Sequence, residues 1–162
     1  AGPVSYRDLT LTSPRDGRVL LERLNLEIGP GSRLLVTGPN SSARIALFRA
    51  TAGLWHDGSG EIVRPDLDQV LFVPERPYLP PATLREALLR TGRENVVSDS
   101  EILDALAKLD LELVVARADG LDCECDWQAL LSLGEQHSLA LARVLIAAPP
   151  FAFLDRPGTA LD

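Results

Sequence analysis

A short apolar run followed by a turn and a helical pattern limits what this chain can fold into. Residues 33 to 37 form a strand-length apolar run, and the turn Gly38 to Asn40 follows at once. Residues 43 to 52 then carry apolar side chains at helical spacing up to Gly53. An apolar run of this length is typical of a strand buried inside a parallel sheet. The sequence therefore predicts a strand, a loop and a helix of the kind found in α/β folds.

Strand and helix patterns alternate along the rest of the chain, and no internal repeat or linker-like tract interrupts them. The alternation predicts an α/β fold in one domain, residues 1 to 162. Further strands are predicted at 4–12, 19–28, 61–63, 69–73 and 151–154, and helices at 84–90, 98–117 and 132–148.

The loop after the first apolar run has part of the pattern of a phosphate-binding loop, G-x-x-x-x-G-K-[S/T]. In that pattern backbone N–H groups face phosphate oxygens, the lysine reaches the outer phosphates and the hydroxyl residue binds Mg²⁺. Gly38 is present, but Ala43, Arg44 and Ile45 replace the second glycine, the lysine and the hydroxyl residue. Taken alone, the match is no better than an ordinary strand–turn–helix. The candidate nucleotide-binding residues are Gly38, Pro39, Asn40, Ser41, Ser42, Ala43, Arg44, Ile45 and Ala46.

Composition excludes some classes of function. The formal net charge of −7 argues against binding the phosphate backbone of nucleic acids, so no nucleic-acid partner is expected. No apolar run approaches the roughly 18 to 20 residues that a membrane-spanning helix needs. A membrane association is therefore expected to come through a partner or another part of the polypeptide.

The second half of the chain carries four segments whose order is informative. Leu131 to Gln136 opens a helix, Phe151 to Asp155 is an apolar strand ending in a carboxylate, and Thr159 to Asp162 follows. Upstream lies Val73 to Pro77. In this order the segments resemble the signature motif, Walker B strand, D-loop and Q-loop of the ABC transporter ATPase family. The local sequences at 52–55, 76–78 and 125–127 are similar to subfamily D cassettes and to bacterial relatives with a fused permease.

The resemblance implies a P-loop NTPase (RecA-like) core with an N-terminal antiparallel β part and a helical subdomain at about 80–135. It also implies truncation at the C-terminus, since the family's switch histidine would lie beyond the last residue. In such cassettes ATP lies between two domains, gripped by the phosphate loop of one and the signature motif of the other. The signature residues are Ser132, Leu133, Gly134, Glu135 and Gln136, and the D-loop residues are Ala160, Leu161 and Asp162.

The implied partners are a second cassette and the transmembrane domain of a transporter. The implied location is the cytoplasmic face of a membrane, that of the bacterial inner membrane in particular. The implied cofactors are ATP and Mg²⁺. Asp155 would orient the metal through water, and Glu75, at the place of the family's glutamine, could ligate it.

Three replacements predict poor hydrolysis. Arg44 is larger and flatter than a lysine, and Ile45 has no side-chain oxygen for the metal. Arg156 stands where the family has the glutamate that polarises water, and an arginine, with a pKa above about 12, cannot act as a base. Each lost group costs a factor of about 10² to 10³ in rate, by analogy with transition-state donors. The two histidines, His56 and His137, are predicted to be surface residues.

Three functions stay open on the sequence. The chain is a degenerate cassette whose signature motif completes the ATP site of a partner, with weakened binding of its own ATP and Mg²⁺. Alternatively it is a non-transport pseudo-ATPase that acts as a binding or regulatory module, or a decayed or truncated copy without ATP-dependent function.

Overall fold

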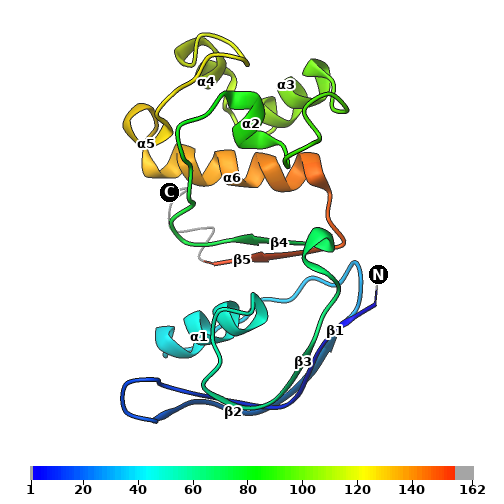
Figure 1. The fold of residues 1–162 in the computed structure, drawn as a ribbon, viewed down its shortest axis with the longest axis vertical. Helices are drawn as coiled ribbons and strands as arrows, with labels where there is room; N and C mark the ends of the chain where they lie inside the picture. Colours follow the sequence, from blue (N-terminus) through cyan, green and yellow to red (C-terminus); the bar gives the residue numbers. More distant parts are fainter. Residues whose placement is uncertain (1, 156–162) are drawn as a thin grey trace. The chain divides into compact units, whose positions relative to one another are not determined.

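The computed structural model describes residues 2 to 155 and divides the chain into two compact units, Ala1–Phe72 and Val73–Asp162. The first unit is an antiparallel three-stranded sheet with the order β2-β1-β3, and a helix packs on one of its faces (Figure 1). Its elements are β1 (Val4–Thr12), β2 (Val19–Ile28), α1 (Ser41–Thr51) and β3 (Gly58–Val63). The sheet confirms the expected N-terminal antiparallel β part, and β1 and β2 have the predicted bounds.

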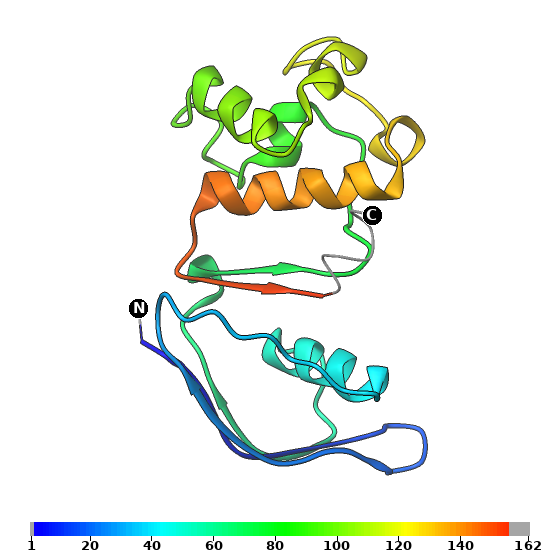
Figure 2. The ribbon, with the colours of Figure 1, turned by 180° about the vertical axis from the view of Figure 1, so that it is seen from behind.

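The predicted strand at residues 33 to 37 is wrong. Residues 32 to 38 form a loop that enters α1 (Figure 2), and Leu35 in this loop is 83% exposed. A strand needs a hydrogen-bonded neighbour for its backbone. The three strands of the first unit pair only with one another in the described part of the chain, so the apolar run has no such neighbour there.

Two glycines at positive φ lie in β3, although glycines at this spacing are more typical of a turn. Gly58 and Gly60 have φ angles of +144° and +95°. A Cβ added at Gly58 would lie 2.0 Å from the carbonyl oxygen of Thr10, and one at Gly60 would lie 2.3 Å from that of Asp8. The two glycines therefore allow the backbone of β3 to approach that of β1 closely.

A hydrogen bond between buried side chains joins α1 to β1, and a second bond within α1 sets its direction. The hydroxyl of Thr51 donates to the carbonyl oxygen of Leu47 at 2.7 Å, and its oxygen lies 2.8 Å from the Tyr6 hydroxyl. Because Thr51 has a single hydroxyl hydrogen, Tyr6 is the donor in the second bond. Both side chains are buried, and burial raises the pKa of Tyr6 above its usual value.

Thr51→Val is therefore expected to destabilise the protein more than Tyr6→Phe. The valine leaves a buried tyrosine hydroxyl without an acceptor, at a cost of about 1 to 3 kcal/mol, whereas the phenylalanine removes one bond worth about 0.5 to 1.5 kcal/mol and leaves Thr51 bonded to Leu47. Urea denaturation of the two variants checks the order. Equal losses would show that the hydroxyl of Tyr6 finds another acceptor in Thr51→Val.

The second unit is mainly helical. Figures 1 and 2 show its longest helix, α6, lying between β5 on one side and the shorter helices on the other. The 3₁₀ turn Leu67–Gln69 precedes β4, and β4 pairs with β5. The last residue of β4, Val73, is the first residue of this unit. From Val70 onward the elements of the chain are β4 (Val70–Val73), α2 (Leu84–Leu88), α3 (Asp99–Ala107), α4 (Glu112–Arg117), α5 (Trp127–Leu130), α6 (Leu133–Ala147) and β5 (Phe151–Leu154).

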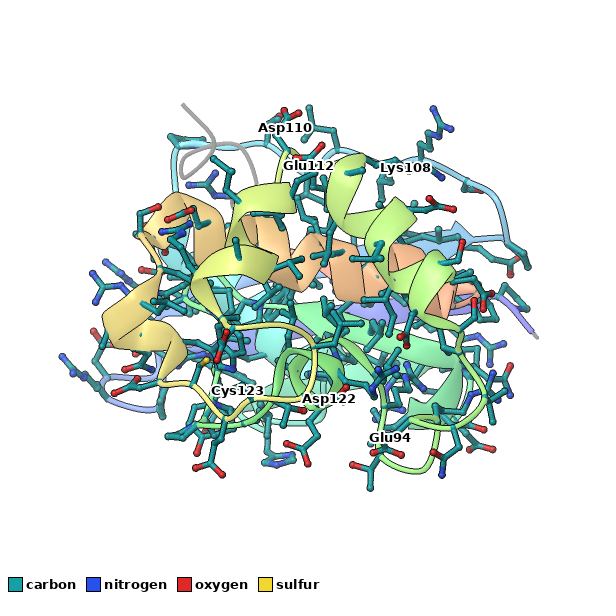
Figure 3. All side chains as sticks on the ribbon, turned by 90° about the horizontal axis from the view of Figure 1, so that it is seen from above. Glu94, Lys108, Asp110, Glu112, Asp122 and Cys123 are labelled. Atoms are coloured by element: carbon teal, nitrogen blue, oxygen red, sulfur yellow. The ribbon has the colours of Figure 1, made fainter. Side chains whose placement is uncertain are left out.

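Helix starts in this unit were predicted better than helix lengths. Thr83, Ser98 and Ser132 each cap a helix, and each forms a capping box with a glutamate three residues later. The single helix predicted from 98 to 117 is two helices, because Asp110 adopts a φ of +56° between α3 and α4. Figure 3 labels Lys108, Asp110 and Glu112 around this break.

One apolar cluster holds the helices of the second unit together. Trp127 is fully buried in it, as expected for a packing residue. At its edge Arg85 of α2 forms ion pairs with Asp99 and Asp122, both at 2.8 Å. The buried members of the cluster are Leu79, Leu84, Leu88, Leu89, Ile102, Leu106, Leu111, Val114, Ala118, Trp127, Leu131, Leu139 and Ala142.

Candidate nucleotide site

The N-terminus of α1 is capped by the side chain of Asn40. Its Oδ1 accepts hydrogen bonds from the backbone N–H groups of Ser42 at 3.0 Å and Ala43 at 3.3 Å. The first turn of α1 contains no acidic residue, so the positive end of the helix dipole is unopposed. This end of α1 suits an anion, but a phosphate that uses the two amides must displace the Asn40 carbonyl oxygen.

Exposure varies along the candidate phosphate loop. Gly38, Pro39 and Asn40 are exposed, and a Cβ at Gly38 would meet nothing within 4 Å. Ala46, at the other end, is fully buried, so its side chain is not available to a nucleotide. Of the remaining residues Ser42 is exposed and Ser41, Ala43, Arg44 and Ile45 are half-buried.

Arg44 is the one basic residue of the candidate loop, and one of its N–H donors is unused among the described residues. Its Nε is buried and has no hydrogen-bond partner among the described residues. A buried donor without a partner is costly, and a phosphate oxygen would satisfy it. The next residue, Ile45, offers no oxygen. The loop therefore fits nucleotide phosphates better than it fits their metal ion.

In the second unit the signature residues lie at the N-terminus of α6. The Ser132 oxygen accepts from the backbone N–H of Glu135 at 3.2 Å, and a carboxylate oxygen of Glu135 accepts from the N–H of Ser132 at 3.0 Å. The hydroxyl hydrogen of Ser132 stays available to donate. Ser132 and Leu133 are exposed, while Gly134, Glu135 and Gln136 are half-buried. The Gln136 amide donates to the carbonyl oxygen of Leu131 at 3.1 Å.

A basic side chain offsets the one acidic residue in the first turn of α6. Arg117 of α4 forms an ion pair with Glu135. This contact, together with the hydrogen bond from the Ser132 amide, holds the pKa of Glu135 below its usual value. Because the negative charge of Glu135 is balanced, the N-terminus of α6 can still attract an anion.

The candidate metal residues Glu75 and Asp155 belong to one hydrogen-bonded region of the second unit. The backbone N–H of Asp155 donates to the carbonyl oxygen of Val73 at 2.8 Å. Both carboxylate residues are half-buried. Among residues 2 to 155 no group of three or more His, Cys, Asp and Glu side chains could hold a metal ion. Mg²⁺ is often bound by only one or two carboxylates together with substrate phosphates, so this pair fits Mg²⁺ only with a nucleotide.

The prediction that His137 is a surface residue is wrong. His137 is 1% exposed, and its Nε2 contacts the backbone carbonyl oxygen of Glu75. Its neighbours Ser138, Leu139 and Ala140 are also buried, so this stretch of α6 is covered on nearly all sides and gives no helical stripe that sequence could reveal. His56 is exposed, as predicted.

The remaining predicted site residues lie outside the described residues. They are Arg156, Ala160, Leu161 and Asp162.

Comparison with known proteins decides the family. The sequence model of the family described as ABC transporter matches residues 21–159. The chain belongs to the ABC transporter family. It is 43% identical, over 98% of its length, to an uncharacterized ABC transporter ATP-binding protein of Synechocystis, and covers 24% of that protein. It is 40% identical over 96% of its length to ABC transporter D family member 1 of Arabidopsis thaliana, covering 12% of it. It is 32% identical over 98% of its length to human ATP-binding cassette sub-family D member 3, covering 25%.

A solved structure agrees with the family. A bacterial Atm1-family ABC exporter with ATP bound matches 99% of this chain with a TM-score of 0.80 and 25% sequence identity, and the chain covers 30% of it. The chain thus spans less than a third of the length of each of these relatives. It is the nucleotide-binding domain of an ABC transporter with a P-loop α/β fold, and it resembles members of subfamily D. None of its described helices is long and apolar enough to cross a membrane.

Proposed function

We propose that this domain is deficient in ATP hydrolysis and completes the ATP site of a partner cassette through its signature motif. A difference between two helix N-termini carries the proposal. At α1 the amides are occupied by Asn40 and Ile45 offers the metal no oxygen, whereas at α6 Ser132 is exposed and the charge of Glu135 is balanced by Arg117.

The domain's own nucleotide would be held by few groups. The loop Gly38 to Ala46 would offer the freed amides of α1 and the unpartnered Nε of Arg44 to the phosphates. Glu75 and Asp155 would share the Mg²⁺, which neutralises phosphate charge when it is bound. With Ile45 in place of a hydroxyl residue and Arg156 in place of a carboxylate, both metal binding and activation of water are weakened.

The partner's nucleotide would meet a better-equipped surface. The free hydroxyl hydrogen of Ser132 can donate to an outer phosphate, because Ser132 is exposed and its oxygen is used only as an acceptor in the capping box. The D-loop residues 160 to 162 would contact the partner cassette. In this arrangement residues 1–162 act as one cassette domain with a helical part at about 80–135, attached through a transporter's transmembrane domain to the cytoplasmic face of a membrane, the bacterial inner membrane in particular.

Calorimetry with Mg-ATP tests the proposal, first on this chain alone and then with a hydrolysis-competent cassette of the same subfamily added. We expect weak binding alone and tighter binding in the mixture. Ser132→Ala should reduce the gain in affinity in the mixture by roughly tenfold or more, because a hydrogen bond to a charged group is worth about 1.5 to 3 kcal/mol.

Ser98→Ala is the matched control, because Ser98 caps α3 with the same capping box. Both variants lose a helix cap worth about 0.5 to 2 kcal/mol of stability, but only Ser132 lies in the signature motif. If the two variants lower the gain in ATP affinity equally, Ser132 acts only as a helix cap. No nucleotide binding in either case, and no complex between the cassettes, would instead favour a non-transport binding module.

A further inference from the structure

The buried histidine of α6 joins the signature helix to the loop that carries Glu75. The Nε2 of His137 contacts the backbone carbonyl oxygen of Glu75, and its Nδ1 is buried without a hydrogen-bond partner among the described residues. A carbonyl oxygen can only accept, so Nε2 carries the hydrogen and Nδ1 keeps an unused lone pair. An apolar side chain of the same volume would avoid the cost of that buried lone pair. The contact to Glu75 is therefore the feature that distinguishes this histidine from a packing residue.

A second contact, a backbone hydrogen bond, holds the same loop two residues before Glu75. The carbonyl oxygen of Val73 accepts the backbone N–H of Asp155 at 2.8 Å. Pro74 stands between the two fastened residues, and its ring fixes its own φ angle. The short segment from Val73 to Glu75 is thus held at one end by Asp155, next to β5, and at the other by His137 of α6. Pro74 makes the segment between these two contacts stiff.

We propose that His137 is a positioning residue that fixes the backbone of Glu75 relative to Asp155, so that both carboxylates act on one Mg²⁺. The inference deepens the proposed function and rests on it. It also gives α6 a second role. The helix that presents Ser132 to a partner's nucleotide also holds, through His137, the metal-binding loop of its own cassette.

Amide hydrogen exchange of the full chain, measured by NMR without nucleotide, tests the positioning contact. The amide to follow is that of Asp155, which is bonded to Val73. His137→Ala should speed its exchange by about tenfold relative to amides inside α6, because the loop gains a local opening. His137→Gln should restore protection, since the glutamine amide can donate to the Glu75 carbonyl oxygen.

Leu139→Ala is the matched control. Leu139 is fully buried two residues further along the same helix, in the apolar cluster. Its truncation should speed exchange at Asp155 and inside α6 alike. If His137→Ala behaves in the same way, or if glutamine fails to restore protection, His137 is a packing residue and the inference is overturned.

The second readout is the effect of Mg²⁺ on ATP affinity, measured by calorimetry with and without the metal. Loss of a group that orients metal ligands costs roughly 10- to 100-fold in metal affinity. We therefore expect Mg²⁺ to raise the ATP affinity of His137→Ala about tenfold less than that of the wild type. The affinity measured without Mg²⁺ should be unchanged. His137→Gln should recover the effect of the metal. If Mg²⁺ raises the ATP affinity of His137→Ala as much as that of the wild type, the inference is overturned. A wild-type chain that binds no ATP and forms no complex with a partner cassette, but whose Asp155 amide responds to His137→Ala, overturns the proposed function and leaves the positioning contact supported.

Discussion

Gly60→Ala is expected to destabilise the first unit by about 2 to 5 kcal/mol. The new Cβ would lie 2.3 Å from the carbonyl oxygen of Asp8 and 2.7 Å from the Cα of Leu9, both backbone atoms of β1. Overpacking costs about 1 to 3 kcal/mol, and the φ of +95° adds about 1 to 2 kcal/mol for a residue with a Cβ. Urea denaturation followed by circular dichroism measures the loss.

Gly17→Ala separates the two causes. Gly17 lies in the turn between β1 and β2 of the same unit with a φ of +70°, and a Cβ there would meet nothing within 4 Å. Its replacement should cost only the strain of about 1 to 2 kcal/mol. If both variants lose the same stability, β1 and β3 are not as close as the structure places them.

Arg44→Lys, Ile45→Ser and Arg156→Glu, combined in one chain, are expected to raise ATP turnover by about 100-fold or more above the near-background rate that we propose for the wild type. The lysine supplies a compact ammonium on a flexible stem, the serine supplies an oxygen for the metal, and the glutamate supplies a carboxylate that can polarise water. The Arg156 change rests on the sequence, because that residue lies outside the described part of the chain. Phosphate release at saturating Mg-ATP, in the presence of a partner cassette, gives the rate.

Adding Asp155→Asn to the restored chain provides the control, because it removes a carboxylate that would orient the metal. The gain should then disappear. A wild-type chain that already turns over ATP as fast as the triple variant would show that Arg44, Ile45 and Arg156 do not limit the reaction.

The sequence predicted elements whose signals are local. The strands at 4–12, 19–28 and 151–154 were found with the observed bounds, because each is closed by turn or proline residues. The predicted starts of the helices at 84–90, 98–117 and 132–148 agree to within one residue with the observed starts, where Thr83, Ser98 and Ser132 are the caps. Such signals need no knowledge of what the element packs against.

The sequence failed where the outcome depends on distant residues. The apolar run at 33 to 37 has strand composition, but a strand exists only with a neighbour to pair with. Gly58 and Gly60 have the composition of a turn, and only the closeness of β1 shows why they lack side chains. His137 is polar, so its burial follows from a carbonyl oxygen 62 residues away in the chain.

The Asn40 side chain at the start of α1 has a consequence for the domain without nucleotide. Its carbonyl oxygen takes the place that a phosphate oxygen would occupy, so the loop supplies its own neutral acceptor for the N–H groups of Ser42 and Ala43. The first unit therefore does not depend on ATP to satisfy the amides of this helix and can fold while the site is empty. A measured affinity for ATP therefore already includes the cost of displacing the Asn40 side chain from these amides, on the order of 1 kcal/mol.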